Sequence, residues 1–269
     1  MKIGVIGLGV VGSAVKQGLE NLGHKVVTHD IKYGTTINDV LETEIVFVCV
    51  PSPSKSDSSC DTSIIESVIE ELDVEFYQGI IAVRSTIEPG FTERMIEKYS
   101  GLEICFVPEF LRERCALQDF TQNHQALIVG THSDHIYNKM IQAHGRYPKT
   151  TVMLNPTEAE IVKLYANAFA AMKVVFANIM YELTNSLGGD YNSVKAAFLK
   201  TGKIDANYLD VNKSLRGYGG VCLPKDAVAL AKLLEKKGFN FELIAAIHND
   251  NEKFETTVFE GMRNVKTDT

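Results

Sequence analysis

The sequence has little of what marks a nucleic-acid-binding, disulfide-bonded or membrane-spanning protein. Its 269 residues include 27 Lys and Arg against 34 Asp and Glu, and the net charge of −7 disfavours nucleic acid or an anionic membrane as a partner. The five cysteines form no C-x-x-C pair, so neither a disulfide framework nor a zinc site is expected. No apolar run reaches the roughly 18 residues of a membrane span, and the start, MKIGVIGLG, enters a strand pattern without a signal peptide. We therefore expect a reduced, cytoplasmic protein with no metal site.

The first part of the chain alternates short apolar runs with helix-like stretches. The runs that we predict to be strands are KIGVIG (2–7), KVVTHD (25–30), EIVFVCV (44–50), GIIAVRS (79–85), EICFVPE (103–109) and QALIVGT (125–131). They are rich in β-branched residues and largely continuous in their apolar character, which is typical of strands buried on both faces of a parallel sheet. Residues 1–154 are therefore predicted to form a doubly wound, Rossmann-type α/β domain.

A long helical pattern follows this domain. It begins at Pro156, a residue suited to the first turn of a helix, and runs to about Leu187, before the stop signal Gly188-Gly189. Apolar residues occupy more than one face of this helix, so we expect it to be buried against several neighbouring elements or against a second subunit. Shorter helices are predicted near residues 192–201, 224–237 and 241–254. Residues 155–269 are thus expected to be an all-helical domain with one long central helix, through which the protein forms a homodimer.

The segment GLGVVG, from Gly7 to Gly12, lies between the first predicted strand and the first predicted helix. Such a G-x-G-x-x-G turn lets a dinucleotide pyrophosphate approach the backbone at the N-terminus of the helix. Asp30 ends the second predicted strand, where its carboxylate can accept from a ribose 2′-hydroxyl and repels a 2′-phosphate. We therefore predict NAD as the cofactor in preference to NADP. A glycine turn with an unrelated Asp is the alternative.

Polar residues follow the third, fourth and fifth predicted strands, at the edge where open α/β sheets bind ligands. Pro51 follows the third strand, and Ser85 and Thr86 follow the fourth. The segment PEFLRE after the fifth strand carries Glu109 and Glu113, two carboxylates that could move protons or hydrogen-bond a substrate. The alternative for both is a solvated loop.

Two further groups of reactive side chains lie in the predicted helical domain. Lys163 and Asn167 are spaced i,i+4, so both leave the same helix face, where they could stabilise a developing alkoxide. Cys222 stands just before Pro224, and a thiol at a helix N-terminus beside Lys225 is expected to have a lowered pKa. Asp226 lies four residues on, on the same side of that helix. The alternatives are a surface lysine and an inert, buried cysteine.

Six stretches together resemble one family, the UDP-glucose/GDP-mannose dehydrogenases, which are NAD-dependent nucleotide-sugar 6-dehydrogenases. The stretches are GLGVVG, VPSP, STIEPG, PEFLRE, EAEIVKLYANAFAAMKVVFAN and GYGGVCLPKD. The resemblance continues into LIAAIHNDNEK and so covers nearly the whole chain. It implies two hydride transfers from C6 of a UDP- or GDP-sugar. A cysteine thiohemiacetal and then a thioester lead to the uronic acid.

The resemblance also implies a role for each matching residue. Cys222 matches the nucleophile, Lys163 with Asn167 the oxyanion-stabilising pair, and Glu113 a residue near the nicotinamide. The catalytic residues that we predict are Cys222, Lys163, Asn167, Asp226, Thr86 and Glu109. The predicted cofactor-binding residues are Gly7, Gly9, Val10, Val11, Gly12, Asp30, Pro51, Ser85, Thr86, Glu113 and Lys225. The predicted substrate-binding residues are Glu109, Phe110, Leu111, Lys163, Asn167, Tyr218, Gly219 and Gly220.

Three departures from the family pattern affect the substrate expectation. The chain ends at Thr269, before the further α/β domain that usually grips the nucleotide, so we expect a shortened form or one completed by another chain. KID at residues 203–205 stands near where the family has Arg-Ile-Gly, and the loop SDSSCDTS lacks a usual glycine. Two alternatives stay open: a 3-hydroxyacid-type dehydrogenase, which needs no cysteine, and a non-catalytic NAD-binding relative. The identity of the sugar is not encoded in these motifs.

Overall fold

The chain divides into two compact units. The computed structural model describes residues 1–57, 59–220 and 222–257, without the side chain of Cys222. Unit 1 comprises Met1–Lys55 and Cys60–Lys163, and unit 2 comprises Ser56–Ser59 and the chain from Leu164 onward. The long helix α6 (Pro156–Ser186) belongs to unit 1 in its first two turns and to unit 2 thereafter. The predicted domain boundary between residues 154 and 155 stays a prediction.

Unit 1 is built on a seven-stranded sheet with the order β2-β1-β3-β4-β5-β6-β7. Its strands are β1 (Lys2–Ile6), β2 (Lys25–His29), β3 (Ile45–Val48), β4 (Ile80–Val83), β5 (Glu103–Phe106), β6 (Ala126–Gly130) and β7 (Thr150–Leu154). The first five strands pair in parallel. Strand order reverses at β1, which lies between β2 and β3, and ligands bind outside the carboxyl ends of the strands at such a point. The prediction of a doubly wound, Rossmann-type α/β domain is confirmed.

The sheet differs from the predicted one at its far edge. Phe106 of β5 pairs antiparallel with Gly130 of β6, so β6 and β7 run against the other five strands. Apolar continuity in QALIVGT marked a buried strand, but burial carries no information on strand direction. β7 was not predicted from the sequence. Its first three residues are exposed, and an edge strand of this kind lacks the continuous apolar run by which the others were found.

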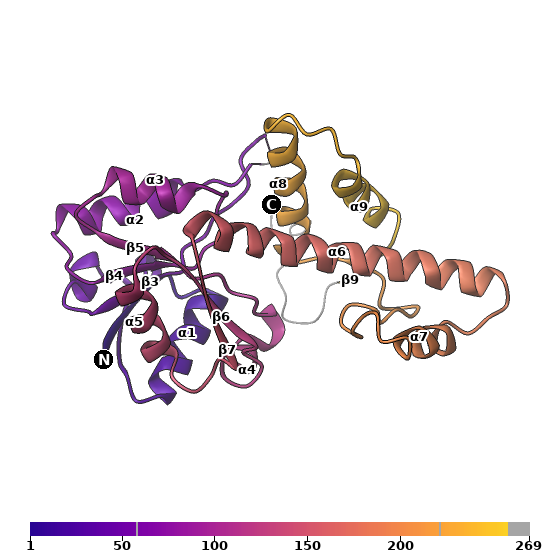
Figure 1. The fold of residues 1–269 in the computed structure, drawn as a ribbon, viewed down its shortest axis with the longest axis horizontal. Helices are drawn as coiled ribbons and strands as arrows, with labels where there is room; N and C mark the ends of the chain where they lie inside the picture. Colours follow the sequence, from indigo (N-terminus) through magenta and orange to yellow (C-terminus); the bar gives the residue numbers. More distant parts are fainter. Residues whose placement is uncertain (58, 221, 258–269) are drawn as a thin grey trace. The chain divides into compact units, whose positions relative to one another are not determined.

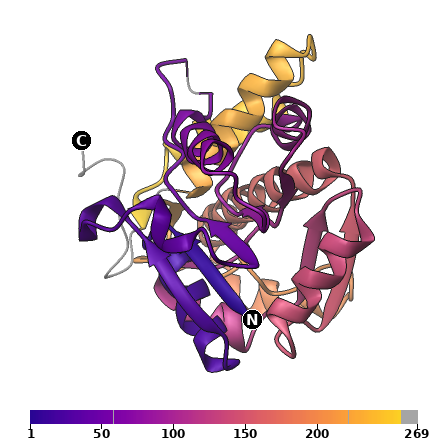
Figure 2. The same ribbon diagram turned by 90° about the vertical axis from the view of Figure 1, so that its left-hand side faces the viewer.

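Helices cover both faces of this sheet (Figure 1). They are α1 (Val10–Asn21), α2 (Ser63–Val74), α3 (Phe91–Lys98), α4 (Ala116–Thr121) and α5 (Asp134–His144). Successive strand residues point to opposite faces, so Val46 and Val48 pack in the cluster with α2 and α3, whereas Ile45 and Phe47 pack with α1, α4 and α5. Figure 2 shows α2 and α3 on one side of the strands and α1 on the other. The sheet is therefore held rigidly from both faces, and its loops project from a fixed edge.

Unit 2 is helical, as predicted. Besides most of α6 it contains α7 (Tyr191–Leu199), α8 (Cys222–Lys236) and α9 (Leu243–Asn251). A parallel ladder of two residues a strand, β8 (Gly217–Tyr218) with β9 (Thr256–Thr257), was not predicted. Its strands are too short to show a sequence period. One apolar cluster of this unit includes Ala171 and Val175 of α6 with Tyr218 and Ile247.

The helix α6 passes a length-and-composition test for a membrane-spanning segment among the residues that the structure describes. The core helix of a soluble protein passes the same test, and 44% of the most apolar stretch of α6 is buried within the protein. The helix also carries Lys163 and Lys173, both buried and both in ion pairs. A cytoplasmic location without a membrane or nucleic-acid partner stays a prediction.

Candidate active site

The glycine loop after β1 has the backbone that its sequence requires. Gly7 adopts a φ of +87°, and a Cβ atom there would lie 2.8 Å from the main-chain oxygen of Cys49. A Cβ atom on Gly12 would lie 1.8 Å from the main-chain oxygen of Gly7, so α1 can pack this closely on the loop only without a side chain at this position. These two glycines therefore fix the path of the loop into α1.

The N-terminus of α1 fits an anionic group. Gly9 is its N-cap residue and supplies no side-chain acceptor to the first helical turn, which includes Val10 and Val11. The first N–H groups of a helix lack intrahelical partners and carry the positive end of the helix dipole. A Cβ atom on Gly9 would meet no atom within 4 Å, so the space in front of the loop is open. This arrangement fits the pyrophosphate of a dinucleotide.

Asp30 follows β2 and faces the glycine loop. Its Oδ2 accepts a 2.7 Å hydrogen bond from Leu8 N, and its Oδ1 accepts a 2.9 Å bond from Lys32 N. The bond from Leu8 is the main cause that lowers the pKa of Asp30, although partial burial opposes it. The carboxylate is thus ionised near neutral pH, as an acceptor for ribose hydroxyls should be. The loop, the helix N-terminus and Asp30 together fit NAD.

The ends of β3 and β4 are tied to each other next to this loop. Ser85 is buried, and its hydroxyl donates a 2.6 Å bond to the main-chain oxygen of Val50. The main-chain oxygen of Thr86 accepts a 3.2 Å bond from the Cys60 thiol. Pro51 is exposed at the start of the loop after β3. Because β1 to β5 are parallel, all the predicted site residues that follow them lie at one edge of the sheet.

Lys163 and Glu109 form a buried ion pair at that edge. The Lys163 ammonium donates to Glu109 Oε1 over 2.9 Å and to the main-chain oxygen of Glu109 over 2.5 Å. Glu109 Oε2 accepts a further 2.7 Å bond from Leu111 N. Burial opposes ionisation of Glu109, but the Lys163 charge and these hydrogen bonds outweigh it and lower the pKa of the carboxyl group. Neither side chain is the solvated surface group that the sequence left open.

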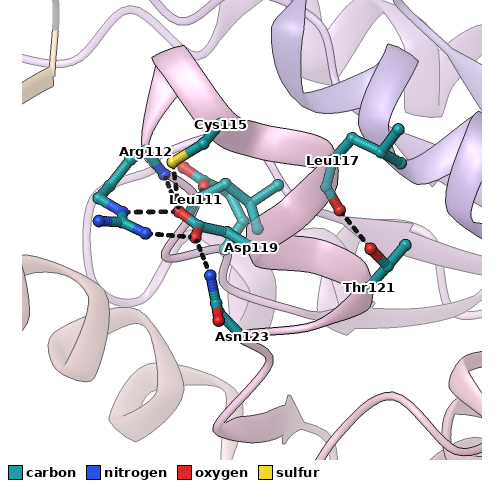
Figure 3. A network of polar contacts seen from close by, with 8 residues as sticks. Leu111, Arg112, Cys115, Leu117, Asp119, Thr121 and Asn123 are labelled. Atoms are coloured by element: carbon teal, nitrogen blue, oxygen red, sulfur yellow. Dashed lines mark hydrogen bonds and ion pairs between the residues drawn. The ribbon is translucent and has the colours of Figure 1, made fainter.

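A second set of contacts holds the loop between Glu109 and α4. Asp119 of α4 accepts bonds from the main-chain N, Nε and Nη2 of Arg112 at 2.9, 2.9 and 2.7 Å (Figure 3). Asn123 adds a 3.0 Å bond to the same carboxylate. Phe110 and Leu111 therefore lie in a loop that is fixed at both ends. Glu113, the first residue of a short 3-10 helix (Glu113–Cys115), follows directly.

Within unit 2, the side chains of Asn167 and Asp226 meet. Asn167 Nδ2 donates a 2.5 Å bond to Asp226 Oδ2, and Asp226 is almost completely buried. Lys225 Nζ lies 3.6 Å from the other carboxylate oxygen. The i,i+4 spacing places Asn167 one turn after Lys163 on the same face of α6. The predicted pairing of these two residues is thus compatible with the helix that carries them.

The segment before α8 is anchored by Asn251. Its carboxamide accepts a 2.8 Å bond from Tyr218 N and donates a 2.9 Å bond to the main-chain oxygen of Tyr218. The Tyr218 ring packs with Ala171 and Val175, so its role in substrate binding stays a prediction. Gly219 and Gly220 follow, and Gly220 has a φ of +79°. α8 begins at Cys222, two residues before the predicted start at Pro224, and the thiol lies outside the described part of the structure.

The sequence reasoning missed three residues that hold site segments in place, namely Asp119, Glu160 and Asn251. Asp119 and Glu160 are charged residues on helices, where solvent exposure is the usual outcome. The spacing of Glu160, three residues before Lys163 on the same helix face, was the one available signal.

The model of the UDP-glucose/GDP-mannose dehydrogenase family, NAD binding domain, matches residues 32–146. The central-domain model of the same family matches residues 157–253. The chain belongs to this family. The family resemblance and the assignment of NAD as the cofactor are therefore confirmed, and the family is one of NAD-dependent oxidoreductases.

Three relatives give the extent of the likeness. A putative UDP-glucose 6-dehydrogenase of Bacillus subtilis is 27% identical over 94% of this chain and 68% of its own length. A UDP-glucose 6-dehydrogenase of Pseudomonas aeruginosa is 29% identical over 81% of this chain and 51% of its own length. The solved UDP-glucose dehydrogenase of Pyrobaculum islandicum superimposes with a TM-score of 0.84 at 26% identity, covering 94% of this chain and 68% of that one. The chain thus spans about half to two thirds of these relatives.

Proposed function

We propose that the protein oxidises a nucleotide sugar at C6 with NAD as the oxidant. The observation that carries the proposal is the buried Lys163–Glu109 ion pair at the sheet edge that bears the glycine loop. Most lysines keep their ammonium group in water, because removing it from water is costly. A lysine buried against a carboxylate, as Lys163 is, therefore calls for a functional explanation. In the reaction that we propose, this ammonium acts on the C6 oxygen of the substrate.

Each of the chain's own groups has a definite task in this reaction. When bound, NAD supplies the hydride acceptor, and two equivalents take up the four electrons between a primary alcohol and a carboxylate. Lys163 and Asn167 stabilise the negative charge that develops on the C6 oxygen. Glu109 and Asp226, with Thr86, hold the water and take up protons. The sum is alcohol, two NAD⁺ and water giving carboxylate, two NADH and three protons.

Cys222 carries the second oxidation. Its thiolate adds to C6 of the aldehyde, and the resulting thiohemiacetal gives up a hydride to leave a thioester. Water then cleaves the thioester, releases the uronic acid and returns the thiol. The start of α8 at Cys222 supports this role, because a helix N-terminus favours the ionised thiol. Two other thiols offer no substitute: burial raises the pKa of Cys49 to about 12 and also raises that of Cys105.

The test is a screen for NAD reduction with UDP- and GDP-sugars in which NADH is counted against sugar consumed. Two NADH for each sugar, with a uronic acid as the product, support the proposal. One NADH for each substrate, unaffected by Cys222→Ser, would favour a 3-hydroxyacid-type dehydrogenase. NAD binding without turnover on any sugar would favour the non-catalytic relative. The Cys222→Ser variant is the matched control, since it keeps the cofactor loop and Lys163.

The protein is further proposed to form a homodimer through α6. Five large apolar side chains, each at least 40% exposed, follow one side of this helix at spacings of four, seven, three and four residues. They are Tyr165, Phe169, Phe176, Ile179 and Leu183. A soluble protein rarely leaves such a contiguous stripe uncovered. A second copy of the same stripe, related by two-fold symmetry, is a self-complementary cover for it.

A further inference from the structure

Glu160 is a fully buried carboxylate on α6, three residues before Lys163. Its Oε2 accepts a 2.5 Å hydrogen bond from Gly90 N, and its Oε1 accepts a 2.8 Å bond from Thr92 N. Both donors lie at the start of α3, in the segment that follows β4 and carries Thr86. A buried carboxylate with two backbone donors is well satisfied, and replacing it leaves those donors without partners.

Glu160 supplies the cap that α3 lacks. The N-cap residue of α3 is Gly90, which has a φ of +91° and no side chain to accept from the first turn. The first N–H groups of any helix need an acceptor, and a carboxylate there also interacts favourably with the helix dipole. Here the acceptor comes from a different element, so the cap also fixes α3 against α6.

One face of α6 therefore holds two loops of the sheet edge. Glu160 binds the segment after β4 by accepting from the main-chain N–H groups of Gly90 and Thr92, and Lys163 binds the segment after β5 through Glu109. The start of α6 is itself packed tightly on the sheet, because a Cβ atom on Gly130 would lie 2.7 Å from the Cβ atom of Ala159. A shift of either loop relative to Lys163 would have to break the buried hydrogen bonds of Glu160 or the buried ion pair of Lys163 with Glu109.

We propose that Glu160 is a positioning residue that sets the Thr86–Gly90 segment relative to Lys163. The inference rests on the proposed function, in which Thr86 and Lys163 act on the same substrate. Glu160 touches neither substrate nor cofactor in this scheme. It acts through the backbone of Gly90 and Thr92. These contacts hold the segment after β4 close to the turn of α6 that carries Lys163.

The test compares Glu160→Gln with Glu158→Gln. Glutamine keeps the size of Glu160 but has only one acceptor oxygen, and its amide would face one of the two N–H donors. Glu158 is an exposed residue of the same helix, so its variant controls for loss of a negative charge on α6. The measurements on the folded full chain are kcat and KM for each substrate, the NAD dissociation constant, and hydrogen exchange at the amides of Gly90 and Thr92.

We expect Glu160→Gln to lower kcat by about 100-fold, the order of effect of misplacing a reacting group by about 1 Å. KM for the sugar should change far less, and exchange at Gly90 and Thr92 should accelerate. Glu160→Asp, which keeps the charge and both acceptor oxygens, should recover part of kcat, whereas a residue that only filled space would gain nothing from it. Glu158→Gln should match the wild type in every measurement.

The outcomes separate this inference from the function on which it rests. If the wild type is active and Glu160→Gln keeps full kcat despite faster exchange, Glu160 is a structural cap only and the inference is wrong. If the wild type oxidises no nucleotide sugar, the proposed function fails, and hydrogen exchange then decides about Glu160. In that case Glu160→Gln with wild-type exchange at Gly90 and Thr92 would overturn the positioning role as well. If the Gln variant does not fold, the same measurements on Glu160→Asp decide.

Discussion

The Lys163 ammonium contacts both the carboxylate and the main-chain oxygen of Glu109, at 2.9 and 2.5 Å, and both side chains are buried. Each ion thus has a partner inside the protein in place of the water that it has lost. Removal of one partner strands the other charge in a medium of low polarity, which costs far more than the intact pair contributes. The pair is therefore sensitive to single substitutions and tolerant of paired ones.

Lys163→Met is expected to lower the free energy of unfolding by about 3–5 kcal/mol at pH 7, because Glu109 is left buried and unpaired. Lys163→Met with Glu109→Gln should recover part of this loss. The pH dependence has a definite sign. Since the pKa of Glu109 is lowered from its usual 4.5, the pair's contribution is complete above about pH 4.5 and is lost as the pH falls through the folded-state pKa. Urea unfolding of the three proteins at several pH values measures both effects. Equal stability of Lys163→Met and the wild type would mean that the pair is not buried in solution.

A buried cluster on the face of the sheet that α1, α4 and α5 cover makes the protein sensitive to mild acid. His144 Nδ1 lies 2.8 Å from the main-chain oxygen of Met140, and its Nε2 lies 3.3 Å from Arg84 Nη1. Because Arg84 can only donate, the neutral ring with the proton on Nδ1 satisfies both contacts. Burial, and then the Arg84 charge, lower the pKa of His124 to about 4 and that of His144 well below its usual value.

The free energy of unfolding should therefore fall as the pH drops below about 6.5. In this range the histidines of the unfolded chain become protonated, whereas His124 and His144 of the folded chain stay neutral. For His124 alone the loss should reach about 2 kcal/mol at pH 5, and it should level off near pH 4. Urea unfolding between pH 7.5 and 5 measures the slope. His124→Phe should reduce it. A wild-type free energy that is flat over this range would refute the prediction.

The cofactor preference depends on Asp30. NAD should raise the unfolding temperature more than NADP does, since the Asp30 carboxylate accepts from a ribose hydroxyl and repels a 2′-phosphate. Asp30→Asn should reduce the NAD shift and narrow the difference between the two cofactors. Glu42→Gln is a suitable control, because Glu42 is an exposed carboxylate paired with Lys2 at the opposite end of β1. Thermal shift with both cofactors decides, and an equal or larger shift with NADP would remove the assignment of Asp30.

The sheet and the long helix could be predicted because their signals are local. Apolar runs mark β1 to β5, and Pro156 with the glycines after Ser186 brackets α6 to within one residue of its observed end. In the same way, Pro224 gave a predicted start of α8 within two residues of its observed start at Cys222. The exposed edge strand β7 and the direction of β6 could not be predicted, since both depend on pairing between distant segments.

In the candidate site, too, some residues could be predicted from local sequence and others could not. Its reactive groups lie in recognisable motifs, at a strand end for Glu109 and along one helix face for Lys163, so both could be named in advance. Their supports could not, because Glu160 and Asp119 read as ordinary surface charges until the fold brings them to backbone N–H groups. Burial of a charge is a tertiary property, and the spacing of Glu160 three residues before Lys163 gave only their shared helix face, not their burial.

The apolar stripe on α6 predicts how the chain associates. Phe176 lies in the middle of the stripe, so Phe176→Lys should place a charge in the dimer contact and shift the protein to monomer at micromolar concentration. Val74→Lys, at an exposed apolar position at the end of α2, should leave association unchanged. Sedimentation equilibrium on the three proteins is the measurement. A monomeric wild type would contradict the proposed dimer.

The last prediction concerns the reactivity of Cys222. If α8 favours its ionised form, this thiol should react with iodoacetamide faster than Cys49 and Cys105 in the folded protein, because only the thiolate is a nucleophile. Cys49 has its pKa raised by burial to about 12, so it should stay unlabelled after brief treatment at pH 7, and so should Cys105. The rate at Cys222 should persist below the ordinary thiol pKa of about 8.5, and peptide mapping measures it without any substrate.

Two controls make the comparison quantitative. In urea all the thiols should label at similar rates, which shows that protection comes from the fold. In Cys222→Ser the fast phase should disappear while the slow ones remain. That variant should also stop the second oxidation yet keep the first hydride transfer, which uses Lys163 and NAD, so a trace of aldehyde should accumulate. Labelling of Cys222 no faster than of the strand cysteines would remove the thiolate from the mechanism and favour an NAD-binding relative without turnover.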